Sequence, residues 1–295
     1  MASLNYDSPL ALKALLEERG WGMRKKWGQN FLIKGAIRKK LAAALEIEPG
    51  DEVWEIGPGL GAMTRELLEL GARVKAFEID PGFTDFLRGE FGGADFSLVP
   101  GDVLKTWKRE AEAPFLLGNL PYNIAAVLLG DLIEGNRFFR RMVVTVQKEV
   151  GRRLTARPGE ADYSSITVLV AGRYDVKPLM VMGASCFYPP PRVDSLGLRF
   201  DLRENLPAAE TGETTAVPLL YPLVRRLFSF RRKTVKNSLG AFVSSRPGAG
   251  PPAGQKDLVM AALERCGISP GERPENLDVS RFQELARQLQ YLGLR

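Results

Sequence analysis

Glu55-Ile56-Gly57-Pro58-Gly59-Leu60-Gly61 is a glycine-rich turn between a strand pattern and a helix pattern. The apolar run over residues 53–56 predicts the strand, and the apolar spacing over residues 63–70 predicts the helix. Glycines permit a tight turn and a close backbone approach, and the start of a helix offers unpaired N–H groups. Such a turn can simply link two elements, but it also suits a nucleotide-type ligand at the carboxyl end of the first strand.

The alternation of strand and helix patterns continues beyond this turn. Further strands are predicted over residues 73–79, 96–99, 114–117 and 141–146, with a helix over residues 83–91. Alternation at this spacing predicts a parallel sheet covered on both faces, which is the doubly wound α/β class. Residues 193–200 predict a late strand, at the edge of the sheet or in antiparallel sense.

Helical patterns dominate after residue 203. They cover residues 219–230, 255–266 and 280–292, with Asp278 and Ser280 as candidate N-caps. The Ser/Pro/Gly/Ala segment at residues 244–254 cannot continue a helix. The sequence therefore predicts an α/β domain over residues 1–203, which binds the ligand, and a small helical domain over residues 204–295.

The composition excludes several kinds of chemistry. The 295 residues contain no histidine, which removes histidine-based triads, imidazole acid–base catalysis and metal sites that need a histidine. Cys186 and Cys266 are far apart in sequence and argue against a disulfide framework, so we expect a reducing compartment and no metal. The first twenty residues lack a long apolar run and no later stretch approaches a membrane span, so we expect a cytoplasmic protein without a membrane partner.

Carboxylates follow the second and third predicted strands. Glu78 lies at the tip of the second strand, where an acidic side chain can accept both hydroxyls of a ribose. Asp102 lies just past the third strand, where a carboxylate can accept from an adenine amine. Gly57, Gly59 and Ala62 also satisfy the dinucleotide pattern of dehydrogenases.

Two absences weigh against hydride transfer by a dehydrogenase. The chain has no histidine to serve as an acid, and no tyrosine is followed four residues later by a lysine. Asp102 and the turn that follows the fourth predicted strand instead favour S-adenosyl-L-methionine as the ligand.

The turn after the fourth predicted strand is Asn119-Leu120-Pro121-Tyr122. An exocyclic amine on a base is a poor nucleophile because its lone pair is delocalised into the ring. The side-chain oxygen of Asn119 and the carbonyl of Leu120 can accept hydrogen bonds from the two N–H groups of such an amine, while Pro121 fixes the turn. Tyr122 can stack on an extruded base. Methyl transfer would then depend on alignment and on stabilisation of the charge that develops at the amine, without a general base.

The motifs together resemble one family, the ribosomal RNA adenine dimethyltransferases, and within it the bacterial small-subunit (16S) enzymes. The matching stretches follow the family order across most of the chain: residues 29–32, 55–61, 78–80, 101–103, 118–124, 146–150, 187–195 and 231–234. The resemblance implies a Rossmann-like methyltransferase domain that uses S-adenosyl-L-methionine, followed by a small helical domain that contributes to RNA binding.

The resemblance also implies roles for individual residues. Glu78 would hold the ribose and Asp102 the adenine amine, while Asn30 and Leu32 would close over the methionine end of the cofactor. Phe187 is implied as a second stacking partner for the base. The full cofactor set that the resemblance implies is Asn30, Leu32, Gly57, Gly59, Gly61, Glu78, Ile79, Asp102, Val103 and Asn119.

Three basic clusters indicate contacts to nucleic acid. One lies within residues 225–236 and includes Arg231, Arg232 and Lys233, and the others lie at residues 152–157 and 24–26. A charge run is usually a solvated face, but three clusters in a chain with a base-modifying turn favour phosphate contacts. The formal net charge of +6, from 41 basic and 35 acidic residues, permits a polyanionic partner.

The activity implied by the resemblance is dimethylation of N6 on two adjacent adenosines in the 3′-terminal hairpin of the small-subunit RNA. The implied partner is that RNA in an assembling pre-30S particle, and the implied state is a monomer. Two alternatives stay open at this point: a 23S rRNA adenine N6-methyltransferase, and a non-catalytic RNA-binding assembly factor on the same fold. Residues 29–32 and 187–195 favour the small-subunit branch, and an intact Asn119 argues against lost catalysis.

Overall fold

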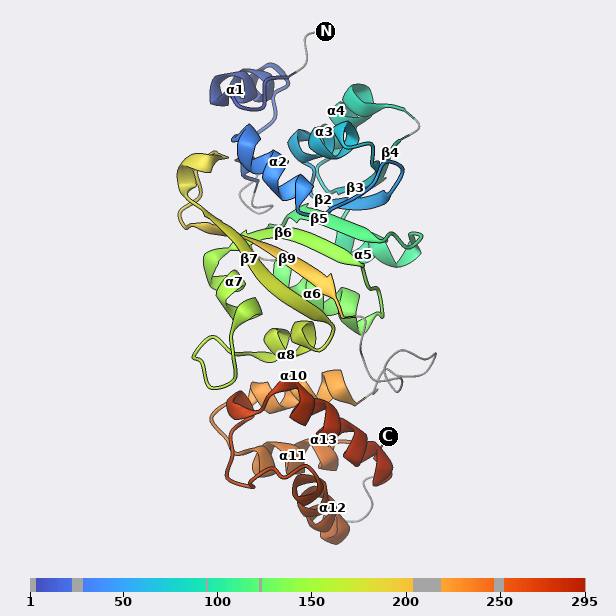
Figure 1. The fold of residues 1–295 in the computed structure, drawn as a ribbon, viewed down its shortest axis with the longest axis vertical. Helices are drawn as coiled ribbons and strands as arrows, with labels where there is room; N and C mark the ends of the chain where they lie inside the picture. Colours follow the sequence, from blue (N-terminus) through green and yellow to red (C-terminus); the bar gives the residue numbers. More distant parts are fainter. Residues whose placement is uncertain are drawn as a thin grey trace. The chain divides into compact units, whose positions relative to one another are not determined.

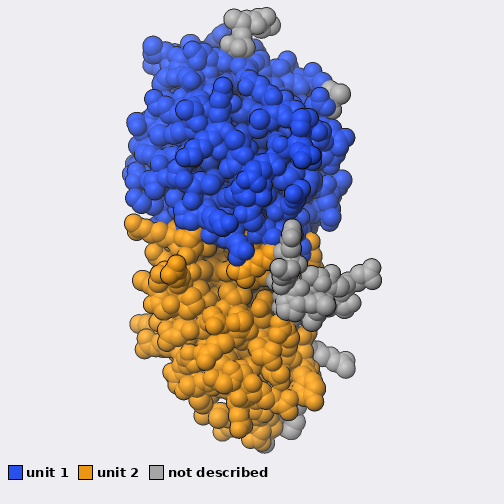
Figure 2. Space-filling view, viewed as in Figure 1, with its two compact units in different colours: residues 1–132, 137–151, 175–202 blue, residues 133–136, 152–174, 203–295 orange. Residues whose placement is uncertain are grey.

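The computed structural model describes residues 4–22, 29–93, 95–121, 124–203, 219–246 and 252–294 (Figure 1). The chain divides into two compact units (Figure 2). The first comprises Met1–Leu132, Arg137–Gly151 and Asp175–Leu202, and the second comprises Ile133–Asn136, Arg152–Tyr174 and Arg203–Arg295. Residues 152–174 therefore group with the C-terminal helices. The domain limit at residue 203, expected from the sequence, stays a prediction.

A mostly parallel sheet forms the centre of the first unit. Over the described residues it has seven strands in the order β4-β3-β2-β5-β6-β9-β7. The parallel strands are β2 (Glu52–Ile56), β3 (Arg73–Glu78), β4 (Phe96–Pro100), β5 (Phe115–Asn119) and β6 (Arg141–Gln147). The predicted α/β class is confirmed. The strand order reverses between β2 and β5, which is where an open α/β sheet binds its ligand.

The far side of the sheet differs from the prediction in one respect. β9 (Ser195–Leu202) pairs with β6 in antiparallel sense, as predicted, but β7 (Tyr174–Met182) lies beyond it and forms the edge. The β7 sequence contains Lys177 and Pro178, which are typical of an edge strand because an edge tolerates a missing N–H donor. Its weak alternation of apolar and polar residues explains why the periodicity did not predict it.

Helices cover the sheet (Figure 1). Leu41 of α2 and Leu67 of α3 belong to one apolar cluster with Val53, Val74 and Phe115 of the strands, so α2 and α3 pack on one face. β2 and β5 are buried along most of their length, as expected for strands covered on both faces. The helices are α1 (Pro9–Glu18), α2 (Gly35–Ala43), α3 (Ala62–Glu69), α4 (Pro81–Phe91), α5 (Val103–Thr106), α6 (Ala125–Glu134) and α7 (Lys148–Thr155).

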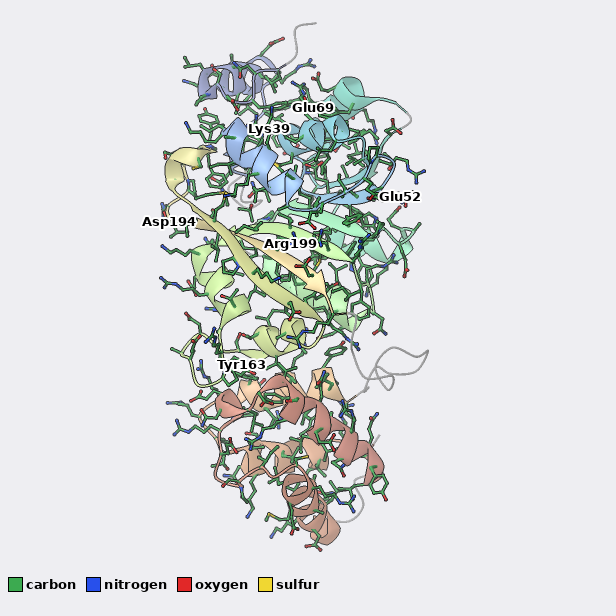
Figure 3. All side chains as sticks on the ribbon, in the orientation of Figure 1. Lys39, Glu52, Glu69, Tyr163, Asp194 and Arg199 are labelled. Atoms are coloured by element: carbon green, nitrogen blue, oxygen red, sulfur yellow. The ribbon has the colours of Figure 1, made fainter. Side chains whose placement is uncertain are left out.

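The second unit has an apolar helical core of its own. Tyr163 (labelled in Figure 3) is buried in this core, and its hydroxyl donates to the carbonyl of Leu277 at 2.8 Å. The predicted cap Asp278 accepts from the N–H of Arg281, whereas the Ser280 hydroxyl donates to Asp278 and does not cap the helix. The helices are α8 (Ser165–Ala171), α10 (Leu220–Ser229), α11 (Val235–Ser244), α12 (Pro252–Arg265) and α13 (Val279–Tyr291).

Two kinds of feature are absent from the described residues. No group of three or more histidine, cysteine, aspartate or glutamate side chains is arranged to hold a metal ion. No helix in the described ranges has both the length and the apolar character that crossing a membrane would require.

Candidate cofactor and catalytic site

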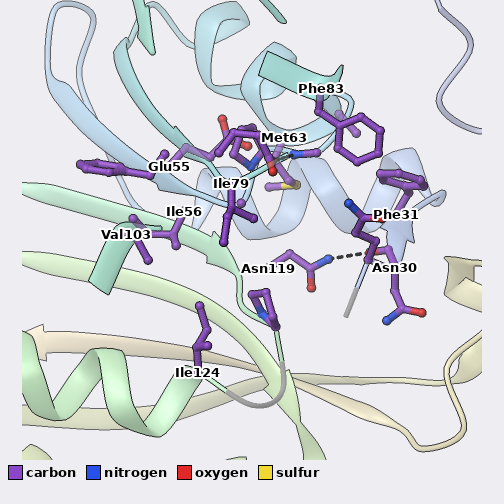
Figure 4. Close-up of a pocket in the computed structure, with 18 of the residues that line it drawn as sticks. Asn30, Phe31, Glu55, Ile56, Met63, Ile79, Phe83, Val103, Asn119 and Ile124 are labelled. Atoms are coloured by element: carbon purple, nitrogen blue, oxygen red, sulfur yellow. Dashed lines mark hydrogen bonds between the residues drawn. The ribbon is translucent and has the colours of Figure 1, made fainter. Parts of the chain in front are cut away.

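A cavity of about 250 Å³ opens at the carboxyl ends of β2, β3 and β5 (Figure 4). Its position is that of the predicted ligand site, beside the point where the strand order reverses. The structure brings most of the predicted site residues together around it. Those that line the cavity are Asn30, Leu32, Gly57, Gly59, Glu78, Ile79, Asp102, Val103, Asn119 and Pro121.

Two glycines of the turn after β2 line the cavity, and their backbone conformation favours glycine. Gly57 and Gly59 have φ values of +70° and +59°, which side chains rarely adopt. A Cβ atom on Gly59 would lie 2.9 Å from the ring of Phe31, so the turn and the Phe31 ring can meet only through a glycine. The Gly59 N–H donates to Oε2 of Glu78 at 3.0 Å, which ties the turn to the end of β3.

Glu78 is buried at the end of β3 and accepts main-chain donors through both oxygens. Oε2 accepts from Gly59 and Oε1 accepts from the N–H of Asp80 at 2.8 Å. Burial, with a smaller contribution from the charge of Asp80, raises the pKa of Glu78 to about 7 although the main-chain donors act to lower it. The carboxylate is therefore held in one orientation at the edge of the cavity.

Glu55 also lines the cavity, and the sequence patterns assigned it no role. It is fully buried on β2, and the Thr64 hydroxyl donates to its Oε2 at 2.6 Å. Burial, together with the nearby charge of Glu78, raises the pKa of Glu55 to about 8. The available signal was a glutamate inside the otherwise apolar run of residues 53–56, because an acid in a buried strand requires an explanation.

Asn119 ends β5 with its side-chain amide oriented by a main-chain group. Its Nδ2 donates to the carbonyl of Asn30 at 2.8 Å, across 89 positions of sequence. Figure 4 shows the amide nitrogen turned toward Asn30 and the side-chain oxygen turned away from it. The bond therefore leaves Oδ1 as the group that can accept from a ligand.

The part of the cavity wall beside α5 combines a carboxylate with apolar side chains. Oδ1 of Asp102 accepts from the N–H of Leu104 at 3.0 Å and caps α5, which fixes the side chain at the cavity wall. Ile79 is 39% exposed although it is a large apolar residue, and Val103 is buried beside the cavity. These apolar side chains suit the faces of a heteroaromatic ring.

The charge of the cavity discriminates between the two classes of ligand that the glycine turn permits. Glu55, Glu78 and Asp102 are among its lining residues, and the described lining contains no lysine or arginine. Such a site disfavours the pyrophosphate of a dinucleotide and favours a cation. S-adenosyl-L-methionine carries a positive sulfonium and an ammonium group, so the residues present fit this cofactor.

Three residues predicted for the two turns are not part of the described cavity lining. Gly61, with φ of +85°, caps α3, and a Cβ atom there would lie 2.2 Å from the Phe91 ring, so packing of α3 on α4 explains this glycine. Leu120 is buried, and its N–H donates to the carbonyl of Thr145 at 3.0 Å. Tyr122 lies outside the described residues.

The structure does not support the role predicted for Phe187. It lies in β8 (Phe187–Tyr188), which pairs with β1 (Phe31–Leu32), and its ring is 3% exposed within the core that contains Leu32 and Leu41. A ring enclosed in a packed core offers no face for a base to stack on. The prediction that Phe187 stacks on the base is therefore not supported, because the sequence shows the aromatic residue but not the direction in which it packs.

The basic cluster of the second unit divides into two kinds of residue. Arg231 is bound by its own chain: its guanidinium contacts Glu275 and donates to the carbonyl of Ala161 at 2.8 Å. Arg232 and Lys233 are exposed. The predicted cluster at residues 24–26 lies outside the described residues.

The fold and the cavity define a class of protein, the Rossmann-like methyltransferases that use S-adenosyl-L-methionine. The model of the ribosomal RNA adenine dimethylase family matches residues 21–248. The chain belongs to this family, and the predicted family and cofactor are confirmed.

Named relatives agree with this assignment. A ribosomal RNA small subunit methyltransferase A of Treponema denticola is 41% identical, over 94% of this chain and 93% of that protein. One of the same name from Borreliella burgdorferi is 37% identical, over 97% of this chain and 96% of that protein.

Two solved structures are similar across most of the chain. A dimethyladenosine transferase from Plasmodium falciparum has a TM-score of 0.75 at 26% identity, covering 88% of this chain and 98% of that one. The 23S rRNA methyltransferase ErmE has a TM-score of 0.60 at 25% identity, covering 88% of this chain and 99% of that one.

Proposed function

We propose that this protein transfers methyl groups from S-adenosyl-L-methionine to N6 of two adjacent adenosines in the 3′-terminal hairpin of the small-subunit (16S) ribosomal RNA. The observation that carries the proposal is the orientation of Asn119, whose amide nitrogen is bound to Asn30 so that its oxygen remains to accept an amine hydrogen. The relatives at 37% and 41% identity support the small-subunit RNA as substrate. ErmE, which acts on 23S rRNA, is less similar in sequence.

The cavity residues divide the cofactor between them. Glu78 would hold the ribose hydroxyls, and Oδ2 of Asp102 would accept the adenine amine because Oδ1 already caps α5. Ile79 and Val103 would cover the faces of the adenine ring. Asn30 and Leu32 would enclose the methionine end, and a cationic group bound there would favour the ionised form of Glu55. When bound, the cofactor supplies an electrophilic methyl group.

The residues of the turn would activate the base. Oδ1 of Asn119 and the carbonyl of Leu120 would each accept a hydrogen bond from one N–H group of the adenine amine. These two hydrogen bonds would draw the amine nitrogen toward a tetrahedral geometry. Because both acceptors are held by the fold, they require little reorganisation as positive charge develops on the amine. The base would have to leave the stack to reach them, and Tyr122 is the expected stacking partner. Pro121 keeps the turn free of a competing N–H.

The partner in this proposal is small-subunit RNA within an assembling pre-30S particle, in the cytoplasm, with the enzyme acting as a monomer. The exposed Arg232 and Lys233 would contribute phosphate contacts. Phosphate contacts of this kind place the protein on RNA without reading the sequence of the bases.

A methyl-transfer assay tests the proposal. The protein is incubated with labelled S-adenosyl-L-methionine and either undermethylated small subunits or undermethylated large subunits, and the RNA is digested to nucleosides. We expect label in N6,N6-dimethyladenosine from the small subunit. Label only in the large subunit would favour the 23S activity, and RNA binding without label would favour a non-catalytic assembly factor.

Asn119→Ala tests the role of the turn. Removal of this acceptor should lower kcat by about 10²- to 10³-fold, as removal of one preorganised transition-state group does. The affinity for RNA should change by less than about twofold, because no phosphate contact is assigned to this side chain. Turnover at the wild-type rate would contradict the assigned role.

A further inference from the structure

The segment Gln29–Leu32 forms one wall of the cofactor cavity, and side chains from two other parts of the chain hold it. At one end, Nε2 of Gln29 donates to Oδ2 of Asp80 at 3.1 Å, across 51 positions of sequence. At the next residue, the carbonyl of Asn30 accepts from Asn119 at 2.8 Å. The segment thus lies between a carboxylate on the ribose side of the cavity and the asparagine that the proposed mechanism uses.

Asp80 is placed to connect the segment to Glu78, the carboxylate expected to hold the ribose. It is 7% exposed and caps α4, with Oδ1 accepting from the N–H of Gly82 at 2.9 Å. Its own N–H donates to Oε1 of Glu78 at 2.8 Å. One residue therefore contacts the start of α4, the segment through Gln29, and the glutamate expected to hold the ribose.

The contacts form a continuous chain from the ribose side of the cavity to the turn after β5. The order is Glu78, Asp80, Gln29, Asn30 and Asn119, and every link except the peptide bond between Gln29 and Asn30 is a hydrogen bond of 3.1 Å or less. The orientation of Asn119 depends on where the Asn30 carbonyl lies. The bond made by the preceding residue, Gln29, restricts that position.

We propose that Gln29 and Asp80 are positioning residues, whose hydrogen bond holds the cavity wall so that the Asn30 carbonyl orients the Asn119 amide. This inference rests on the proposed methyl transfer for its catalytic part. Its structural part, the placement of a wall of the cofactor cavity, can be measured by cofactor binding in the absence of RNA.

A set of three variants tests the inference. Gln29→Glu places a second carboxylate about 3 Å from Oδ2 of Asp80, and like charges at this distance repel. Asp80→Asn keeps a capping oxygen for α4, since asparagine is as good an N-cap as aspartate. The double variant Gln29→Glu with Asp80→Asn restores a hydrogen bond of reversed polarity, because the new amide can donate to the new carboxylate.

We expect Gln29→Glu to raise the Kd for S-adenosylhomocysteine by about tenfold at pH 8 and to lower kcat by a similar factor. The double variant should return both values to within about threefold of wild type. Gln283→Glu makes the same chemical change in α13 of the second unit, at a residue that is not among the described cavity lining, and should leave both values unchanged.

Several outcomes would overturn the inference. Equal defects in Gln29→Glu and in the double variant would show that the residues act independently, and a Gln29→Glu protein like wild type would show that the bond is unimportant. A Tm measurement on each variant separates mispositioning from unfolding, and rescue by the second substitution excludes a general loss of folding. If the wild-type protein fails to methylate small subunits, the proposed function fails, while the Kd values still decide whether the pair positions the wall.

Discussion

Two buried glutamates dominate the electrostatics of the candidate site. Glu55 and Glu78 line the same cavity, both are almost completely buried, and the charge of Glu78 disfavours ionisation of Glu55. Their pKa values are raised from the ordinary 4.5 to about 8 and about 7. A cationic ligand would favour the ionised forms, so binding of the cofactor and loss of protons from these carboxyls are linked.

The pH dependence of cofactor binding follows from this linkage. We expect affinity for S-adenosyl-L-methionine to rise between pH 6 and pH 9, by about tenfold for each unit by which binding lowers the pKa of a carboxyl group. Glu55→Gln should remove the part of the rise near pH 8 and leave the part near pH 7 that belongs to Glu78. Calorimetric titrations at a series of pH values check this. A Kd that does not change with pH in the wild-type protein would contradict it.

The stability of the free protein should change in the opposite direction. Raised pKa values mean that the folded protein binds these protons more tightly than the unfolded chain. The corresponding stability is full below the ordinary glutamate pKa of 4.5 and is lost as the pH rises through about 7 for Glu78 and about 8 for Glu55. Urea denaturation without cofactor at pH 6 and pH 9 should show this decrease, and Glu55→Gln should reduce it.

At the scale of elements, the contact between α3 and α4 is close because of one glycine. Gly61 caps α3 in the left-handed region, with φ of +85°. The atoms that a Cβ there would meet are ring carbons of Phe91 at 2.2 Å and a methyl carbon of Leu87 at 3.1 Å, both on α4. A larger residue would have to move the end of α4 as well as strain the turn beside the cavity.

Gly61→Ala should therefore destabilise the protein. The positive φ costs roughly 1–3 kcal/mol for a residue with a Cβ. Overpacking against α4 adds about 1–3 kcal/mol. Gly89→Ala is the matched control, because it lies within α4 with nothing within 4 Å of the new Cβ, and it should stabilise the protein by about 0.5–1 kcal/mol. Chemical denaturation of both variants measures the difference, and equal effects would show that the contact is unimportant.

For the molecule as a whole, the sign of the net charge does not give the sign of the local charge at each site. The formal net charge is +6, yet the described lining of the cavity is acidic. Within the cluster at residues 231–233, Arg232 and Lys233 are exposed, whereas Arg231 is engaged with Glu275 and the carbonyl of Ala161. A run of basic residues in sequence therefore contains both structural residues and candidates for phosphate contacts.

The salt dependence of RNA binding should separate these two roles. Replacing Arg232 and Lys233 by alanine should lower the slope of log K against log salt by about 0.7 to 0.9 for each phosphate that is no longer neutralised. Arg231→Ala should leave the slope unchanged and cost about 1–2 kcal/mol of stability, because its hydrogen bonds are internal. Filter binding at several salt concentrations tests this, and a change of slope for Arg231→Ala alone would reverse the assignment.

The local features of this protein could be predicted from the sequence. The parallel strands, the glycine turn, the carboxylates Glu78 and Asp102 and the turn at Asn119 all follow from patterns within a few residues, because strand and helix periodicity and turn chemistry are local properties. Most of the predicted site residues therefore line one cavity. The edge strand β7 was not predicted, because its periodicity is weak.

Only the tertiary structure decided which way side chains face and what they contact. It placed Phe187 in the core, engaged Arg231 with its own chain, brought Glu55 into the cavity and paired Asn119 with a carbonyl 89 positions away. These facts depend on partners that are distant in sequence, and burial and hydrogen bonding select such partners only when the whole chain packs. The sequence therefore determined the kind of site, and packing determined which residues form it.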